Sequence, residues 1–377
     1  MDWLRCALPE ESPELARQLG RAFLATQVRA ALEEALSEPA YAAPRLSRYF
    51  RANRKLGSKD RRRASDSVYG IIRHSGLLER AGCRSPGELL EGWIRLLLGD
   101  RLEEVESSLP TADYAAALSL PVSIAGQWME RLPPGEAAQL ASVLAKQAPV
   151  YLRANEAVVD REALQEQLGA EGVETVPCMP ANALRVLGRL QTGESSCFRK
   201  GLFEVQDLSS QRLCEAIPLR PGERVLDFCA GAGGKSLALA ARGAEVFAHD
   251  IRKKALRELA KRAARANARI QEGLPKQADV VLVDAPCSGT GRLRREPAIR
   301  WRFRIQDPLQ HLTAQRELLE RASRHVRPGG RLVYATCSLL EEENTHLPAG
   351  WRRESGSLCW PHRQEGDGFF WSVMVRD

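Results

Sequence analysis

The chain has 377 residues, with 55 Lys and Arg against 48 Asp and Glu, which gives a formal net charge of +7 at pH 7. This length allows two or three domains with cores of their own. The basic excess favours a polyanionic partner, although charge alone does not identify a nucleic acid. The nine cysteines include no C-x-x-C pair, so neither a disulfide framework nor a zinc site is indicated. We find no signal-peptide or membrane-spanning pattern, and free thiols are typical of the reducing cytoplasm.

Residues 1–145 are predicted to form an all-helical domain. Apolar residues recur at helical spacing over residues 15–36, which predicts a helix there. Four basic residues then follow at intervals of three and four: Arg45, Arg48, Arg51 and Lys55. This spacing places them on one face of a helix. The face is either solvated or in contact with RNA phosphates, and the sequence alone leaves both interpretations open.

Residues 146–204 are predicted to form a small α/β module, because the hydrophobic period changes there. Short strands are expected at 150–155 and 173–176, with a helix between them at 161–168.

Residues 205–377 alternate between strands and helices. We expect strands at 225–228, 245–249, 280–283 and 331–335, and helices at 236–241, 253–267 and 315–326. This alternation predicts a mainly parallel sheet with helices on both faces, closed by the apolar residues 369–375 as an edge hairpin. The basic residues of the second helix, Arg262 and Arg265 among them, are interpreted first as a solvated face.

A glycine-rich turn follows the first of these strands, in the sequence CAGAGGK at residues 229–235. Its glycines let the backbone approach a ligand closely, and the next helix offers N–H groups to an anion. A phosphate-binding P-loop is excluded because Cys229 stands at its first glycine position, and a dinucleotide fingerprint fails at Ser236. The remaining candidate is the methionine carboxylate of S-adenosylmethionine. The next strand ends in Asp250, at the distance where an acidic residue meets a ribose hydroxyl.

Two cysteines follow two other strands. Asp284, Pro286 and Cys287 come directly after residues 280–283, and Cys337 follows residues 331–335 within Thr-Cys-Ser. Ligands of open α/β sheets bind outside the carboxyl ends of the strands. We therefore expect both thiols and the Asp284 carboxylate to meet at one rim, beside the glycine turn.

The segment after Cys287 is rich in arginine and interleaved with Trp301 and Phe303. Its arginines are Arg292, Arg294, Arg295, Arg300, Arg302 and Arg304. Cations mixed with flat rings suit a polyanion whose bases can stack. The alternative interpretation is a solvated charged loop.

Three stretches together resemble a known family. They are CAGAGGK at 229–235, DAPCSGTG at 284–291 with the following RR-x-P, and ATCS at 335–338 with EEN at 342–344. In this order they resemble the Sun/Nop family of RNA cytosine-5 methyltransferases, closely over residues 151–377 and loosely before. The resemblance implies a Rossmann-like class I methyltransferase domain at 205–377, an RNA-contacting module at 146–204 and a helical, RNA-binding domain at 1–145. In that module a recurring Arg-x-Asn strand corresponds to Arg153 and Asn155, which are equally well interpreted as locally satisfied.

The resemblance also implies roles for individual residues, which spacing alone does not assign. It makes Cys337 the nucleophile and Cys287 the thiol that assists breakdown of the covalent adduct, whereas DNA cytosine methyltransferases use the proline-cysteine thiol. Asp284 would contact the cytosine edge, best if protonated, and Lys235 would contact the substrate or lower a thiol pKa. The implied S-adenosyl-L-methionine pocket comprises Cys229, Ala230, Gly231, Ala232, Gly233, Gly234, Lys235, Asp250 and Asp284.

One departure from the family concerns the acidic residue expected after the third strand, on the adenine side of the cofactor. Residues 269–277 are short and hold no Asp, so Glu272 is the candidate substitute. The resemblance implies ribosomal RNA as the first-choice substrate and transfer RNA as the second. From the residues themselves we expect a cytoplasmic monomer with no metal and no membrane. The rivals are a DNA cytosine methyltransferase and a non-catalytic RNA-binding or ribosome-assembly protein that keeps the fold.

Overall fold

The computed structural model describes residues 3–100, 110–303 and 306–376. The chain divides into two compact units. Unit 1 comprises residues 1–147 and 292–310, and unit 2 comprises residues 148–291 and 311–377. Residues 292–310, which the sequence analysis placed in the domain at 205–377, therefore pack with the N-terminal helices. Among the residues described, no helix has the length and apolar character needed to cross a membrane.

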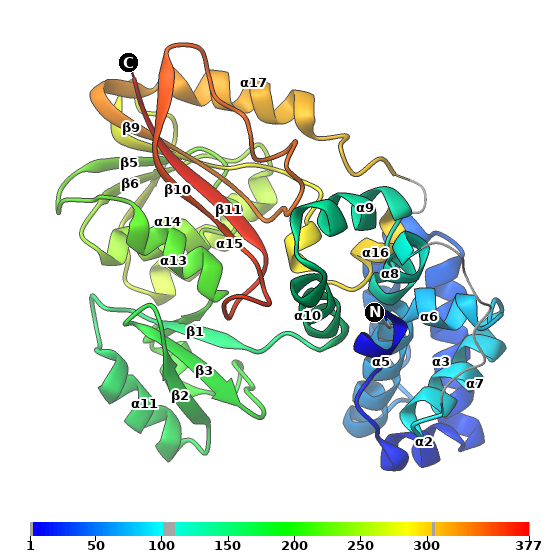
Figure 1. Ribbon diagram of the computed structural model, residues 1–377. Coiled ribbons are helices and arrows are strands. Elements are labelled where there is room, and N and C mark those ends of the chain that lie inside the picture. The colour runs from blue at the N-terminus through cyan, green and yellow to red at the C-terminus, as the bar shows by residue number, and fades with distance from the viewer. Residues whose placement is uncertain (1–2, 101–109, 304–305, 377) are drawn as a thin grey trace. The chain divides into compact units, whose positions relative to one another are not determined.

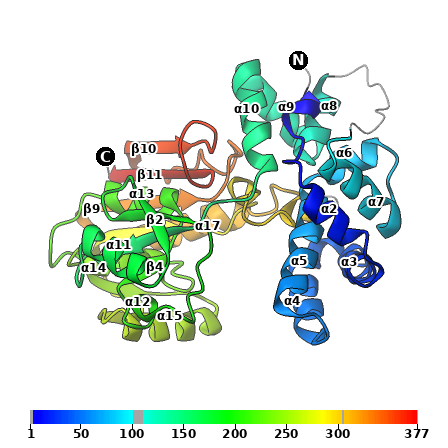
Figure 2. The same ribbon diagram turned by 90° about the horizontal axis from the view of Figure 1, so that it is seen from below.

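Unit 1 is helical, as predicted. Its helices are α1 (Trp3–Cys6), α2 (Pro13–Leu19), α3 (Ala22–Leu36), η1 (Pro39–Tyr41), α4 (Ala42–Ala52), α5 (Ser58–Arg73), α6 (Ser75–Arg80), α7 (Pro86–Leu97), α8 (Pro110–Leu118), α9 (Val122–Arg131), α10 (Pro134–Ala145) and α16 (Ile299–Arg302). The helix expected over 15–36 is two helices, because α2 ends at Leu19 and α3 begins at Ala22. Helix α3 packs on α4 and α5 (Figure 2).

The basic helix face predicted from Arg45, Arg48, Arg51 and Lys55 is wrong for Lys55, and its Arg45 is paired. Arg45 forms ion pairs with Glu34 at 2.7 Å and Glu38 at 2.6 Å, so its charge is already matched within the protein. Helix α4 ends at Ala52, which leaves Lys55 beyond it. A helical spacing of basic residues does not show where the helix stops.

The prediction that the arginine-rich segment faces a polyanion is also wrong for Arg300 and Trp301, which are 1% and 0% exposed. The Arg300 guanidinium donates to the backbone carbonyls of Leu118 at 2.9 Å and Leu144 at 2.9 Å, in the last turns of α8 and α10. Carbonyls in the last turn of a helix have no partner within that helix, so a buried cation satisfies them. Arg304 lies outside the described residues.

Unit 2 contains two sheets. The smaller is four-stranded and antiparallel in the order β2-β3-β1-β4, with β1 (Tyr151–Ala154), β2 (Glu174–Cys178), β3 (Ala183–Leu187) and β4 (Phe203–Val205). Helices α11 (Arg161–Ala170) and α12 (Ser196–Arg199) accompany it. The expected strands at 150–155 and 173–176 are β1 and β2, while β3 and β4 were not predicted.

The larger sheet has seven strands in the order β10-β11-β9-β8-β5-β6-β7. They are β5 (Arg224–Asp227), β6 (Glu245–Ala248), β7 (Ile270–Glu272), β8 (Ala278–Asp284), β9 (Val326–Thr336), β10 (Trp351–Cys359) and β11 (Phe369–Arg376). Strands β5 to β9 are parallel, and β10 and β11 are antiparallel additions. From β5 the chain passes through β6 to β7 on one side of the sheet, and it then continues with β8 and β9 on the other side. The strand order therefore reverses between β5 and β8. Such a switch point is where ligands bind in open α/β sheets.

Helices cover both faces of this sheet, which confirms the predicted Rossmann-like fold. Helices α13 (Leu208–Ala216) and α14 (Gly234–Ala241) pack on one face, and α17 (Leu312–Ser323) packs on the other (Figure 1). Alternate residues of β8 serve the two cores, with Val280 facing one and Val281 the other. The helix α15 (Lys253–Arg265) packs beside α14.

The end of the sheet differs from the prediction. Residues 369–375 were expected at the edge, but β11 lies between β9 and β10, and β10 forms the edge. Residues 352–356 of β10 are exposed and polar or glycine. A strand of this kind lacks the apolar pattern that reveals buried strands, which explains why it was missed.

Candidate active site

The two thiols predicted to converge lie in contact. Strands β8 and β9 are parallel neighbours, with Asp284 paired to Ala335 in register, so the loops that follow them leave the sheet at the same edge. The Sγ atoms of Cys287 and Cys337 are 3.3 Å apart. The hydrogen bond to Cys337, followed by burial, raises the pKa of Cys287 well above its ordinary value. A thiol with a raised pKa keeps its proton and is a weak nucleophile.

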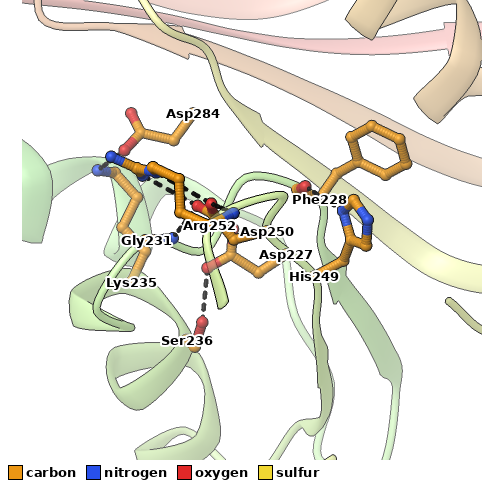
Figure 3. Close-up of polar contacts among 9 residues, drawn as sticks. All are labelled: Asp227, Phe228, Gly231, Lys235, Ser236, His249, Asp250, Arg252 and Asp284. Carbon is orange, nitrogen blue, oxygen red and sulfur yellow. Dashed lines mark hydrogen bonds and ion pairs between the residues drawn. The ribbon is translucent and has the colours of Figure 1, made fainter. Parts of the chain in front are cut away.

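The glycine turn between β5 and α14 has the backbone conformation that only glycine adopts easily. Gly233 has φ of 82°, and a Cβ atom there would lie 2.5 Å from Cγ of Leu259. Gly231 has φ of 55° and donates its N–H to Oδ2 of Asp250 at 2.8 Å (Figure 3). The turn therefore lies directly against the carboxylate that ends the next strand.

The other residues of the turn are held by neighbouring elements. The N–H of Ala230 donates to the carbonyl of His249 at 2.9 Å, and the carbonyl of Ala232 accepts from Nη1 of Arg262 at 2.8 Å. Gly234 begins α14, so the helix N-terminus points into the turn. Cys229 is not a third nucleophile, because burial, followed by the charge of Asp227, raises its pKa to about 12.

Asp250 is 5% exposed and is bound on both oxygens by Arg252, whose side chain is largely exposed (Figure 3). Burial alone would raise the pKa of Asp250, but the hydrogen bonds from Arg252 and Gly231 outweigh it and the pKa is lowered. The carboxylate is therefore ionised at neutral pH. Next to it, Ile251 is 82% exposed, an apolar side chain that the sequence analysis did not single out.

Lys235 and Asp284 form an ion pair across the switch point. The ammonium of Lys235 lies 2.7 Å from Oδ2 of Asp284 (Figure 3). It also lies 5.3 Å from the ring centre of Phe369. Burial would lower the pKa of Lys235, but the charge of Asp284 outweighs it and the pKa is raised. Asp284 was predicted to be most useful when protonated. The structure instead pairs it with a cation, so Asp284 acts here as a hydrogen-bond acceptor.

Asp227, at the end of β5, belongs to the support of the site. It is 1% exposed and accepts a hydrogen bond from Oγ of Ser236 at 2.6 Å (Figure 3). Burial raises its pKa to about 6. The sequence showed Asp227 as a strand-end carboxylate but gave no sign that it would be buried under the turn.

Glu343, Asn344 and Gln315 were missed as functional residues. Glu343 is 0% exposed and binds the residue after Cys287, while Gln315 of α17 binds both Glu343 and the carbonyl of Pro286. The only signal in the sequence was the EEN stretch, to which no role was given. A loop carboxylate has no periodic pattern that would reveal its burial.

Several residues considered for RNA contact have structural partners. Arg153 is 2% exposed and donates to Oε1 of Gln206 at 2.7 Å. Asn155 donates to the carbonyls of Gly201 and Ala266, both at 3.0 Å, so the interpretation as locally satisfied residues holds. The interpretation of Arg262 and Arg265 as a solvated face is wrong, because both pair with buried Glu204.

Glu272 stands at the end of β7, where the missing acid was expected. It is exposed and pairs with Lys253 at 3.0 Å. Its role as a substitute stays a prediction.

Comparisons with known proteins show which proteins the chain resembles. Residues 215–349 match the family described as 16S rRNA methyltransferase RsmB/F. The ribosomal RNA small subunit methyltransferase B of Serratia proteamaculans is 31% identical over 271 residues, which cover 64% of this chain and 63% of that protein. The protein of the same name from Xylella fastidiosa (strain Temecula1) is 34% identical over 266 residues, covering 62% and 61%. The chain thus matches less than two thirds of these relatives' length.

Solved structures show the same fold at lower identity. The crystal structure of PH0851 superposes with a TM-score of 0.73 at 21% identity, covering 98% of this chain and 100% of that one. NSun6 from Pyrococcus horikoshii, solved with SFG, gives a TM-score of 0.59 at 19% identity, covering 68% and 98%. The fold is that of a Rossmann-like methyltransferase. By sequence, residues 215–349 of the chain are similar to the RsmB/F family of methyltransferases.

Proposed function

We propose that this chain is an S-adenosylmethionine-dependent RNA cytosine-5 methyltransferase that works through a covalent cysteine–cytosine adduct. The observation that carries the proposal is the 3.3 Å approach of the Cys287 and Cys337 sulfur atoms at the carboxyl ends of β8 and β9. Two thiols at such a rim suit a reaction in which one adds to a ring and the other assists its release.

The chemistry explains why a nucleophilic thiol is needed. Carbon 5 of cytosine is a poor nucleophile until a thiolate adds to carbon 6, which forms an S–C bond and moves the electron pair of the ring double bond to carbon 5. S-adenosylmethionine supplies an electrophilic methyl group on its sulfonium. After transfer, a base removes the proton from carbon 5, the S–C bond breaks, and the electron pair restores the ring while the thiolate leaves.

We assign Cys337 as the nucleophile and Cys287 as the thiol that assists breakdown of the adduct. The raised pKa of Cys287 supports this division, because a thiol that keeps its proton is a weak nucleophile. A retained S–H of Cys287 can donate a hydrogen bond to Cys337, and during release it can transfer its proton to the leaving Cys337 thiolate.

The Lys235–Asp284 ion pair is proposed to hold the cytosine edge. Asp284 accepts and Lys235 donates, which matches the amino donor and the N3 acceptor of cytosine. Asp284 precedes Cys287 by three residues, so the contact and the release thiol belong to one loop.

The glycine turn and Asp250 fit S-adenosylmethionine. The turn at Cys229–Gly234 brings backbone and a helix N-terminus close to where a carboxylate would lie, and a side chain at Gly233 would collide with Leu259. Asp250 would bind the ribose hydroxyls, with the exposed Arg252 side chain moving aside. Ile251, exposed next to Asp250, would pack on the adenine ring.

Small-subunit ribosomal RNA is the proposed substrate, supported by the names of the relatives, and transfer RNA is the alternative. The proposed organisation is RNA binding by residues 1–145 and 146–204 and transfer by residues 205–377. We propose that the chain acts as a monomer in the cytoplasm. Its free cysteines favour that reducing compartment.

The test uses the purified chain with radiolabelled S-adenosylmethionine and three RNAs: small-subunit ribosomal RNA, large-subunit ribosomal RNA and transfer RNA. We expect transfer to the first, and bisulfite sequencing should then locate a protected cytosine. Transfer to transfer RNA alone would favour the alternative substrate. No transfer to any RNA, together with no heat of binding for S-adenosylmethionine, would favour a non-catalytic RNA-binding protein.

A further inference from the structure

Two consecutive buried residues, Glu343 and Asn344, contact the chain on either side of the two thiols. They are 0% and 6% exposed and lie in the segment between β9 and β10. The function proposed above assigns neither residue a contact with the substrate or the cofactor. Their hydrogen bonds nevertheless divide cleanly between the two cysteine loops.

Glu343 holds the loop of Cys287. Its Oε1 accepts from the N–H of Ser288 at 2.8 Å, and its Oε2 accepts from Oγ of the same serine at 2.6 Å. Oε1 also accepts from Nε2 of Gln315 at 2.9 Å, and that amide donates in turn to the carbonyl of Pro286 at 2.9 Å. The residues immediately before and after Cys287 are therefore both fixed to one carboxylate, directly or through one amide.

Asn344 holds the loop of Cys337 in the same manner. Its Oδ1 accepts from Oγ1 of Thr336 at 2.6 Å, and its Nδ2 donates to the carbonyl of Ser338 at 3.0 Å. These are the residues immediately before and after Cys337. The amide needs both its donor and its acceptor for this arrangement, which a carboxylate or an aliphatic side chain would not supply.

The two sets of contacts are rigidly connected. Glu343 and Asn344 share a planar peptide bond, and their Cα atoms are separated by the fixed distance of about 3.8 Å. The hydroxyl of Tyr334 donates to the carbonyl of Glu343 at 2.8 Å, which anchors the pair to β9. The loops also meet directly, where Oγ of Ser288 and Oγ of Ser338 lie 3.1 Å apart.

We propose that Glu343 and Asn344 are positioning residues that together set the spacing of the two thiols, Glu343 for Cys287 and Asn344 for Cys337. The roles of the two thiols rest on the proposed function, whereas the spacing itself does not. Displacing a reacting group by about 1 Å can cost roughly a hundredfold in rate. A rigid two-residue connection is a direct way to prevent such displacement of either sulfur relative to the other.

The first experiment measures the spacing without any methyl transfer. Diamide, an azo compound, takes two electrons and two protons from two thiols and becomes a hydrazine, while one S–S bond forms. In the full-length protein, we expect limiting diamide to form the Cys287–Cys337 disulfide readily. Mass spectrometry of the linked peptides measures how fast it forms. Glu343→Ala and Asn344→Ala should form it at least about tenfold more slowly, because the effective concentration of one thiol at the other falls.

Matched controls come from exposed neighbours. Glu317→Gln changes a carboxylate on the same helix as Gln315, and Thr345→Ala changes the residue after Asn344, so both should leave the disulfide rate unchanged. Glu343→Gln retains an oxygen for Ser288 and should recover most of the wild-type rate. If an alanine variant unfolds, Ser288→Ala and Asn344→Asp remove single contacts and take its place. A wild type that forms no such disulfide, or alanine variants that form it at the wild-type rate, would overturn the proposal.

The second experiment separates the two positions. RNA containing 5-fluorocytidine traps the covalent adduct, because carbon 5 has no proton to lose. Asn344→Ala should slow trapping about tenfold or more, whereas Glu343→Ala should trap at close to the wild-type rate but accumulate adduct with ordinary RNA. Equal effects of both variants in both assays would contradict the assignment of Glu343 to Cys287 and of Asn344 to Cys337. Failure of the wild type to trap RNA would refute the proposed function and leave the diamide result to judge the spacing.

Discussion

The Cys287 loop and the segment directly after it, residues 292–303, use buried polar side chains in different ways. Around the Cys287 loop, buried polar side chains from three separate segments bind to one another. Glu343 accepts hydrogen bonds from both Ser288 and Gln315. In the following segment, one guanidinium, that of Arg300, binds backbone carbonyls at the ends of two helices. The first arrangement holds the loop that carries the Cys287 thiol. The second satisfies carbonyls in the last turns of α8 and α10.

This difference predicts two kinds of mutational effect. Changes around the thiols should alter the reaction while the fold persists, because the sheet beneath them is held by long apolar strands. Changes at Arg300 should alter stability, because carbonyls in the last turn of a helix have no partner within that helix.

The largest effect is expected at the thiols themselves. Cys337→Ala should lower methyl transfer at least about a thousandfold, since the group that adds to carbon 6 is removed. Cys287→Ala should leave a protein–RNA adduct that survives denaturation, visible as a band of reduced mobility on denaturing gels. The opposite assignment of the two results would exchange the roles of the cysteines.

Arg300→Met tests the helical unit. The substitution roughly keeps side-chain volume but leaves the carbonyls of Leu118, Leu144 and Leu293 without their donor. We expect the free energy of unfolding to fall by about 3–5 kcal/mol, measured by urea denaturation. The control, Arg48→Met on the exposed face of α4, should change it by less than about 0.5 kcal/mol. Unchanged stability with weakened RNA binding would instead restore Arg300 as an RNA contact.

Asp227 makes a pH-dependent prediction beneath the glycine turn. Its pKa is about 6 in the folded chain and about 3.9 in an unfolded chain. The folded state therefore binds the extra proton between these values, and stability falls as pH rises through this window. Asp227→Asn has no carboxyl group to titrate and serves as the reference. Relative to it, the free energy of unfolding of the wild type should fall by about 2–3 kcal/mol between pH 4 and pH 7, measured by urea denaturation. A stability difference that stays constant from pH 4 to pH 7 would show that Asp227 titrates normally.

The strand ends were predictable from sequence, and the buried charges were not. Cys287 and Cys337 follow apolar strands, and parallel pairing of neighbouring strands dictates that their ends meet. Arg300 instead depends on carbonyls 182 and 156 residues away along the chain, and no local pattern reports such partners. The same holds for Glu343, whose burial depends on a serine 55 residues earlier. Sequence patterns therefore predicted that the two thiols meet, but not which buried side chains surround them.

The smallest effect is expected at Ile251, where the proposed cofactor pocket opens to solvent. An apolar side chain that is 82% exposed contributes little to the fold, so Ile251→Ala should leave stability nearly unchanged. If it packs on the adenine ring, the loss of buried apolar area should weaken binding of S-adenosylmethionine about five- to tenfold, or about 1 kcal/mol, by calorimetry. Leu187→Ala, which truncates an exposed apolar residue of β3, is the matched control and should bind as the wild type does. Equal affinities for all three proteins would mean that the adenine lies elsewhere, and Glu272 at the end of β7 would then be the next position to test.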